Sequence, residues 1–179
     1  NYSIDNGTHW ETIATDIEDT MYEWTAPILK KNATGCIVKI ISYTIFGNKV
    51  EKDKSDGAFT IEVISLSSPN GGQKLSPGSI HTILWSTNET ISAAAETLLK
   101  YTTNGGKEWK RIAVLDGNPG FYDWELPLIK KSMDKCKVKV ILKNVKGKNV
   151  GCAESTDVFS IGWTTEDAAA AIAARFEEN

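Results

Sequence analysis

The side chains that could carry acid–base or nucleophilic chemistry are few, because the 179 residues include only two histidines and three cysteines. Nucleophilic catalysis requires a Cys or Ser close to a His and an orienting acid. Cys36 and Cys136 lie within alternating apolar segments, which favours core positions over nucleophiles. His9 falls in an expected turn and His81 early in an expected strand, so both are expected to be structural or solvated. The sequence predicts no catalytic residues, no cofactor and no enzyme activity.

Metal ligands are equally sparse. Two histidines exclude a His-rich metal site. Residues 53–57 place oxygen ligands at alternate positions, as at the start of a calcium loop, but the closing bidentate acid is missing. A polar loop at the end of a strand is the better interpretation, and no metal site is predicted.

Composition excludes two further classes of partner. The chain is 41% hydrophobic and 24% charged, which is typical of a globular protein. Charges of both signs are mixed and the net charge is −3, so no basic surface for nucleic acid is expected. No apolar run reaches the roughly 20 residues needed for a transmembrane helix, so no membrane span is predicted.

An internal repeat organises the chain. Residues 2–10 recur as residues 101–109, and residues 22–27 recur as residues 122–127. The matches continue at an offset of 100 with Lys30, Lys31, Cys36 to Ile40, Ser55, Phe59 and Ile61 against Lys130, Lys131, Cys136 to Val140, Ser155, Phe159 and Ile161. Between Tyr2 and Ile61 the offset changes by one residue, which chance does not produce.

The first repeat is expected to be incomplete. The stretch from about Ser67 to Lys100 precedes the second copy and has no counterpart before Asn1. We expect an incomplete repeat over residues 1–63 and a complete one over 64–162, with almost no flexible linker between them. The first would lack two strands, including the counterpart of Trp85, and a unit of about 60 residues is marginal even when complete. A preceding segment, a strand of a neighbouring subunit or the tail helix is expected to cover the open face.

Period-two alternation predicts short strands. In residues 80–87, His81, Ile83 and Trp85 share one face. In residues 136–143 the alternate residues Cys136, Val138, Val140 and Leu142 are expected to face inward. Further strands are expected at residues 63–66, 97–103, 109–115, 122–126 and 157–161. This spacing predicts an all-β fold of two tandem immunoglobulin-like β-sandwich repeats.

The tail has a different pattern. Residues 163–179 are rich in Ala and Glu, and Thr164 is a candidate N-cap. Ala168, Ile172 and Phe176 fall on one helical stripe. A short C-terminal helix is expected.

Two equivalent turns are expected to be structural hairpins, formed by Ser3, Asp5, Gly7 and Trp10 and by Thr102, Asn104, Gly106 and Trp109. A short carboxylate or amide can bond backbone N–H groups in the turn, Gly accepts a positive φ, and Trp closes the hairpin. The first set resembles the Asp-box, the Ser/Thr-x-Asp-x-Gly-x-x-Trp hairpin of sialidase propellers and many secreted β-proteins. The second set departs from it at Thr102 and Asn104. A sialidase would also need blade-length repeats and an Arg cluster, which the sequence lacks.

The wider pattern consists of Ser68 to Gly72, Ile83 to Ser86, Tyr101 to Trp109, Trp124 to Pro127, Val138 to Val140 and Ser155 to Ile161. It resembles the Ig-like and fibronectin-III-like repeats of bacterial and archaeal secreted or surface proteins. The resemblance implies a non-catalytic, secreted or cell-surface module for spacing, adhesion or assembly. Its expected partner is a second protein, or another copy of itself, bound through the incomplete first repeat.

An accessory domain of a larger extracellular hydrolase is the alternative function, either as a spacer or as a carbohydrate-binding unit. Carbohydrate binding would require a row of exposed aromatic rings on one face. Five of the six tryptophans occupy positions expected inside, which leaves Trp163 alone.

Cys136 and Cys152 fall on what should be successive strands, and in an oxidising compartment they could form a disulfide. Lys52 stands at the position equivalent to Cys152, so Cys36 has no such partner within its own repeat. Reduced, buried thiols are the alternative, and geometry decides between the two.

Overall fold

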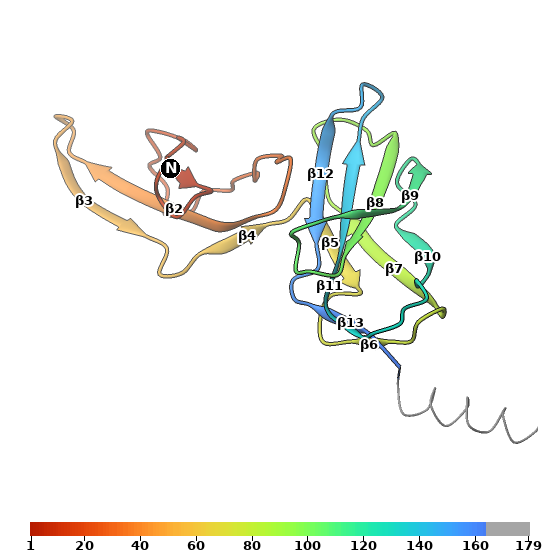
Figure 1. Ribbon diagram of the computed structural model, residues 1–179. Coiled ribbons are helices and arrows are strands. Elements are labelled where there is room, and N and C mark those ends of the chain that lie inside the picture. The colour runs from red at the N-terminus through yellow and green to blue at the C-terminus, as the bar shows by residue number, and fades with distance from the viewer. Residues whose placement is uncertain (164–179) are drawn as a thin grey trace, which may run out of the picture.

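The computed structural model describes residues 1–163, and in that range every regular element is a β-strand. Figure 1 shows two parts joined by the short segment between β4 and β5. Among the described residues, no helix is long and apolar enough to cross a bilayer. The helix expected between Thr164 and Glu178 lies outside the described residues.

The first part, the N-terminal sheet, contains β1 (Tyr2–Ser3), β2 (Ala33–Tyr43), β3 (Lys49–Lys54) and β4 (Phe59–Ile61). The second part, the two-sheet part, contains β5 (Ile64–Ser68), β6 (Lys74–Leu75), β7 (Ile80–Thr87), β8 (Glu96–Thr102), β9 (Lys110–Asp116), β10 (Phe121–Glu125), β11 (Met133–Lys143), β12 (Asn149–Glu154) and β13 (Phe159–Ile161).

The two-sheet part buries one hydrophobic core. A three-stranded sheet in the order β10-β7-β5 lies against a sheet in the order β6-β13-β11-β8-β9, in which β12 also pairs with β11. The alternation predicted for β7 is confirmed, because Ile83 and Trp85 are buried while Ile80 and Leu84 are exposed. The prediction for β11 is confirmed as well, since all four of its inward residues are fully buried: Cys136, Val138, Val140 and Leu142.

The N-terminal sheet has the same strand pairing as part of the six-stranded sheet. Strand β2 pairs with β1, β3 and β4, as β11 pairs with β8, β12 and β13. The register is the same at an offset of 100: Lys39 pairs with Lys54 and Lys139 with Glu154. The irregularity between Ser42 and Tyr43 also recurs, between Leu142 and Lys143.

The two parts differ in what covers the inner face of this sheet. In the two-sheet part, β5 and β7 contribute Ile64, Leu66, Ile83 and Trp85 to the core. In residues 1–61 the structure contains no strand equivalent to β5 or β7. The segment that matches β10, around Trp24, is therefore not a strand, because in the two-sheet part β10 is paired by β7.

Several boundaries differ from the sequence prediction. Strand β12 contains Cys152, which was expected on the strand that follows Cys136, although no bounds were predicted for that strand. The two-residue strand β6 pairs in parallel with β13 and is too short to leave a periodic signal. Strand β11 begins at Met133, three residues before the expected Cys136, because its first residues pair with β13.

Candidate functional site

The first hairpin is held by the side chain of Ser3, which is 2% exposed. Its hydroxyl donates to Asp5 Oδ1 at 2.8 Å and accepts the backbone N–H of Gly7 at 2.9 Å. Gly7 has a φ of +86°, a backbone conformation that favours glycine. Trp10 closes the turn, with its ring 3.2 Å from where a Cβ on Gly7 would stand.

The second hairpin repeats these bonds with different side chains. The Thr102 hydroxyl donates to Asn104 Oδ1 at 2.8 Å and accepts the N–H of Gly106 at 3.2 Å. Asn104 Oδ1 also accepts the N–H of Glu108, as Asp5 Oδ1 accepts that of His9. The eight residues predicted to form the two turns thus lie in the two turns, and their bonds are made to the turns themselves.

Two ring contacts complete each hairpin. Lys39 Nζ lies 3.9 Å from the centroid of the Trp10 ring, and Lys139 Nζ lies 4.1 Å from that of Trp109. Such cation–π contacts tie the hairpin to the neighbouring strand. Tyr2 and Tyr101 contact the equivalent tryptophans of the later segment, each with ring centroids 5.1 Å apart.

The Asp5 carboxylate is strongly favoured in its ionised form. Its pKa lies far below the usual 3.8, first because it accepts the backbone N–H of His9 and then because it bonds the His9 ring and the Ser3 hydroxyl. A second carboxylate, that of Glu11, accepts the Tyr2 hydroxyl and raises the pKa of Tyr2 to about 12. These shifts follow from turn and strand contacts, not from a cleft arranged for proton transfer.

The cysteines do not pair. Cys36, Cys136 and Cys152 are all free thiols. Cys152 lies opposite Ile141, which is five residues from Cys136 along β11 and on the other face of the sheet. Of the two alternatives left open by the sequence, a Cys136–Cys152 disulfide or reduced thiols, the structure has the reduced thiols. Burial raises the pKa of the Cys136 thiol to about 11, which keeps it protonated and unreactive.

One pair was not anticipated from the sequence. Ser68 Oγ lies 3.0 Å from His81 Nε2. A contact between a serine hydroxyl and an imidazole is the first requirement for activating the serine as a nucleophile. No sequence pattern indicates this contact, because the two residues come from different strands. Burial lowers the pKa of His81, which favours the neutral imidazole. Neither residue lines the groove over β8, β9 and β11 or the groove formed by residues 26–29, 59–63 and 88–89, and within residues 1–163 the imidazole forms no hydrogen bond to a carboxylate.

The inner face of the N-terminal sheet is open. Ile40, Val50 and Phe59 are 71%, 64% and 36% exposed. Their counterparts at an offset of 100, Val140, Val150 and Phe159, are 0%, 0% and 1% exposed. The same strands in the same register thus form a core in one part and an uncovered apolar surface in the other.

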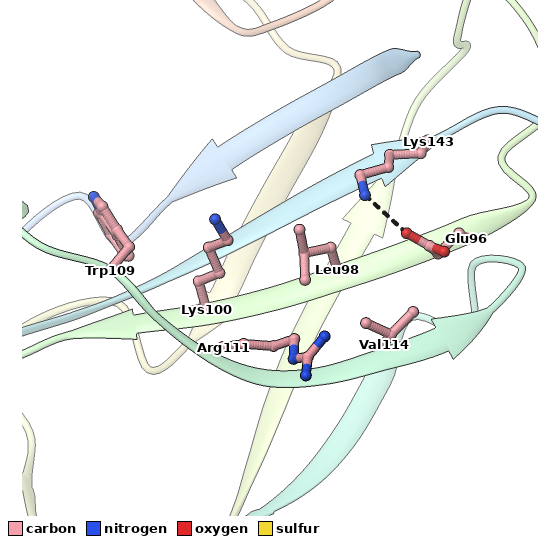
Figure 2. Close-up of a pocket in the computed structure, with 7 residues that line it drawn as sticks. All are labelled: Glu96, Leu98, Lys100, Trp109, Arg111, Val114 and Lys143. Carbon is pink, nitrogen blue, oxygen red and sulfur yellow. Dashed lines mark hydrogen bonds and ion pairs between the residues drawn. The ribbon is translucent and has the colours of Figure 1, made fainter. Parts of the chain in front are cut away.

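A shallow groove of about 510 Å³ runs over the outer face of β8, β9 and β11. Figure 2 shows Lys100 and Arg111 side by side on this face, with Trp109 at one end and the Lys143–Glu96 ion pair of 2.9 Å at the other. Trp109 is the one aromatic residue among the seven that line the groove, and Lys139 covers its ring. The groove therefore presents a single aromatic ring for stacking against a sugar, and Lys139 already covers that ring.

No group of three or more potential metal ligands occurs among residues 1–163. The segment of residues 53–57 that faintly resembled a calcium loop lies at the end of β3, where the carboxylate of Asp53 accepts the backbone N–H of Lys54.

Comparison with protein-family models gives no match, and comparison with curated proteins gives none either. Among solved structures, the chain is similar to the Clostridium thermocellum CbhA fibronectin(III)-like modules, with 14% identity and a TM-score of 0.36 over 55% of this chain and 91% of that chain. It is also similar to a β-1,2-glucanase from Parabacteroides distasonis, with 17% identity and a TM-score of 0.36 over 69% of this chain. The chain spans 17% of the length of that glucanase, and no activity follows from either likeness.

Proposed function

We propose that this chain is a non-catalytic structural or adhesion module of a secreted or cell-surface protein. In this proposal residues 1–63 form an incomplete immunoglobulin-like repeat and residues 64–162 a complete one. The incomplete repeat is finished by β-strands from another polypeptide, which makes the module a subunit of an assembly.

The observation that carries the proposal is the contrast between equivalent inner faces. Val140, Val150 and Phe159 are buried, while Ile40, Val50 and Phe59 are exposed on strands with the same pairing. Apolar side chains that are exposed on a surface whose equivalent is buried are typical of a binding site for another protein. Packing of strands from a partner suits this surface, because in the two-sheet part β5 and β7 form a sheet of their own and cover the equivalent face through their side chains.

The chemistry of the remaining residues supports a non-catalytic role. The hairpin side chains bond their own turns, and the thiols of Cys36 and Cys136 are buried within strands. His81, whose pKa is lowered by burial, contacts Ser68 away from both of the grooves described above. Each reactive side chain is thus used for packing or for turn geometry.

Mass measurement on the native protein tests the proposal. Light scattering during size-exclusion chromatography is expected to show either association of copies or a stoichiometric bound chain. Ile40→Glu is expected to abolish that complex, because it places a charge on the open face. The matched control is Ile80→Glu, since Ile80 is a strand residue of the two-sheet part and is 72% exposed against 71% for Ile40.

The control variant is expected to retain the complex. A stable monomer at every concentration, with no bound chain and a cooperatively folded N-terminal sheet, would exclude completion by another polypeptide. Equal loss of the complex in both variants would place the contact elsewhere.

A further inference from the structure

We propose that the strand pair docking on the N-terminal sheet carries a basic residue over Glu51 and Asp53 and apolar residues over the other end of the sheet. This proposal rests on the proposed function and names the chemistry of the partner. It follows from the few positions at which the inner faces of the two repeats differ.

The two acidic residues lie on the open face. Glu51 pairs with Ser42 and Asp53 with Ile40, and residues directly opposite on paired strands share a face. The equivalent pairs in the two-sheet part are Gly151 with Leu142 and Ala153 with Val140. All four of these counterparts are buried in the core. Glu51 and Asp53 therefore occupy positions that face the core in the complete repeat.

The contacts of Gly151 show how closely the covering segment packs on the sheet at this position in the two-sheet part. A Cβ on Gly151 would stand 3.1 Å from Ile64 Cδ1 and 3.3 Å from Val63 Cγ1. Val63 and Ile64 thus pack so closely on the sheet that even a methyl group on Gly151 would require these side chains to shift by a few tenths of an ångström. Glu51 places a full carboxylate side chain at the equivalent position, so a strand with an apolar residue like Ile64 there would bury an uncompensated charge.

The sheet itself offers these carboxylates no cation. Within the described residues neither Glu51 nor Asp53 forms an ion pair, and Asp53 bonds only the adjacent N–H of Lys54 at 2.9 Å. Lys52 and Lys54 pair with Ile41 and Lys39, so their side chains lie on the opposite face. A compensating Lys or Arg must come from the docking strands.

The other end of the inner face, next to β4, is expected to pack against apolar side chains of the docking strands. Phe59 remains 36% exposed there, although Trp24 packs edge-on against it with ring centroids 6.4 Å apart. The equivalent end of the two-sheet part is covered by Leu66, Ile83 and Trp85. The docking pair is therefore apolar at the β4 end and basic toward the β2–β3 turn.

Two peptides copied from this chain test the proposal. One is residues 62–88, which contain β5 and β7, and the other is the same peptide with Ile64→Lys. Binding of each to the full 179-residue chain is measured by isothermal titration calorimetry. The lysine peptide is expected to bind at least about tenfold more tightly, a preference typical of a gained desolvated charge pair.

Substitutions in the chain locate the effect. Glu51→Gly introduces the residue found at the equivalent position, Gly151, and is expected to make the unmodified peptide bind more tightly than the lysine peptide. Glu51→Gln keeps the side-chain volume without the charge and is expected to make the two peptides bind equally. Lys52→Gln is the matched control, because Lys52 is the next residue of β3 and lies on the opposite face. It is expected to leave the preference unchanged.

The outcomes separate the two proposals. Equal binding of both peptides, or a preference that Glu51→Gln does not change, overturns the basic requirement while strand docking stands. Binding of neither peptide overturns the docking proposal itself. If the full chain also stays monomeric and no other chain is bound to it, the proposed function is overturned as well.

Discussion

The side-chain oxygen of Asn32 accepts a hydrogen bond from the backbone N–H of Val63 at 2.8 Å, where the N-terminal sheet meets the two-sheet part. The same oxygen accepts the N–H of Ile64 at 3.1 Å, and the Asn32 amide donates to Ile64 O at 2.6 Å. One side chain thus satisfies three backbone groups of the junction. These three hydrogen bonds tie the residue before β2 to the start of β5.

Asn32→Ala is expected to loosen the junction. Leaving the N–H groups of Val63 and Ile64 without their acceptor costs about 1–3 kcal/mol. Amide hydrogen exchange at these two residues is expected to accelerate accordingly. The control is Asn88→Ala, which removes one exposed bond to Glu62 O at 2.9 Å and is expected to change stability by less than about 0.5 kcal/mol. Equal exchange in both variants would contradict the role of Asn32.

Phe159→Ala and Phe59→Ala are the same substitution at equivalent positions. Phe159 is 1% exposed, so its truncation is expected to cost about 3–5 kcal/mol of the free energy of unfolding. Phe59 is 36% exposed, so its truncation is expected to cost less than about 1 kcal/mol in the isolated chain. Urea denaturation followed by circular dichroism measures both. Similar costs would mean that the N-terminal sheet is already covered in solution.

Asp5 is expected to make the first hairpin sensitive to acid. Its pKa is lowered by the N–H and ring of His9 and by the Ser3 hydroxyl, so its contribution to stability is present above the unfolded value of 3.8. That contribution is lost as the pH falls below 3.8 toward the folded pKa. The amide resonance of His9, followed by NMR from pH 7 to pH 2, is expected to report this loss.

The second hairpin is the built-in control for this titration, because Asn104 replaces the carboxylate. The amide of Gly106, which donates to the Thr102 hydroxyl in that hairpin, is expected to stay nearly constant over the same range. In Asp5→Asn the His9 amide is expected to lose the change below pH 3.8. A His9 amide that titrates unchanged in Asp5→Asn would assign the effect to another group.

The thiols are expected to react slowly and to show no disulfide. The intact mass with and without reductant is expected to be the same, since all three cysteines are free. At pH 8 the thiolate fraction of Cys136, whose pKa is about 11, is about two orders of magnitude below that of an ordinary cysteine. Alkylation followed by peptide mapping is expected to find Cys152 modified first. A mass two daltons lower without reductant would contradict the geometry.

Local patterns predicted the strands whose residues alternate clearly. Residues 80–87 have the bounds of β7, and the four inward residues of β11 followed from the same alternation. The hairpin residues were also found, because the spacing of Ser3, Asp5, Gly7 and Trp10 reflects bonds made within a few residues. Such features depend on residues that are close together in the sequence, so a sequence pattern can reveal them.

Features that depend on distant residues could not be predicted. The segment around Trp24 matches β10 in sequence but forms no strand, since β10 depends on its pairing with β7. The contact of Ser68 with His81 and the role of Asn32 join residues of different elements. The sequence does not show on which face of the sheet Glu51 and Asp53 lie. The strand register does, because it pairs them with Ser42 and Ile40.

The Ser3 hydroxyl bonds, the positive φ of Gly7 and the Lys39–Trp10 contact persist in the part that has no second sheet. This end of the sheet is therefore preorganised before any binding event. If strands dock on this sheet as proposed, the entropy lost on binding would come mainly from the incoming strands. Such preorganisation of the receptor would favour slow dissociation of the bound strands.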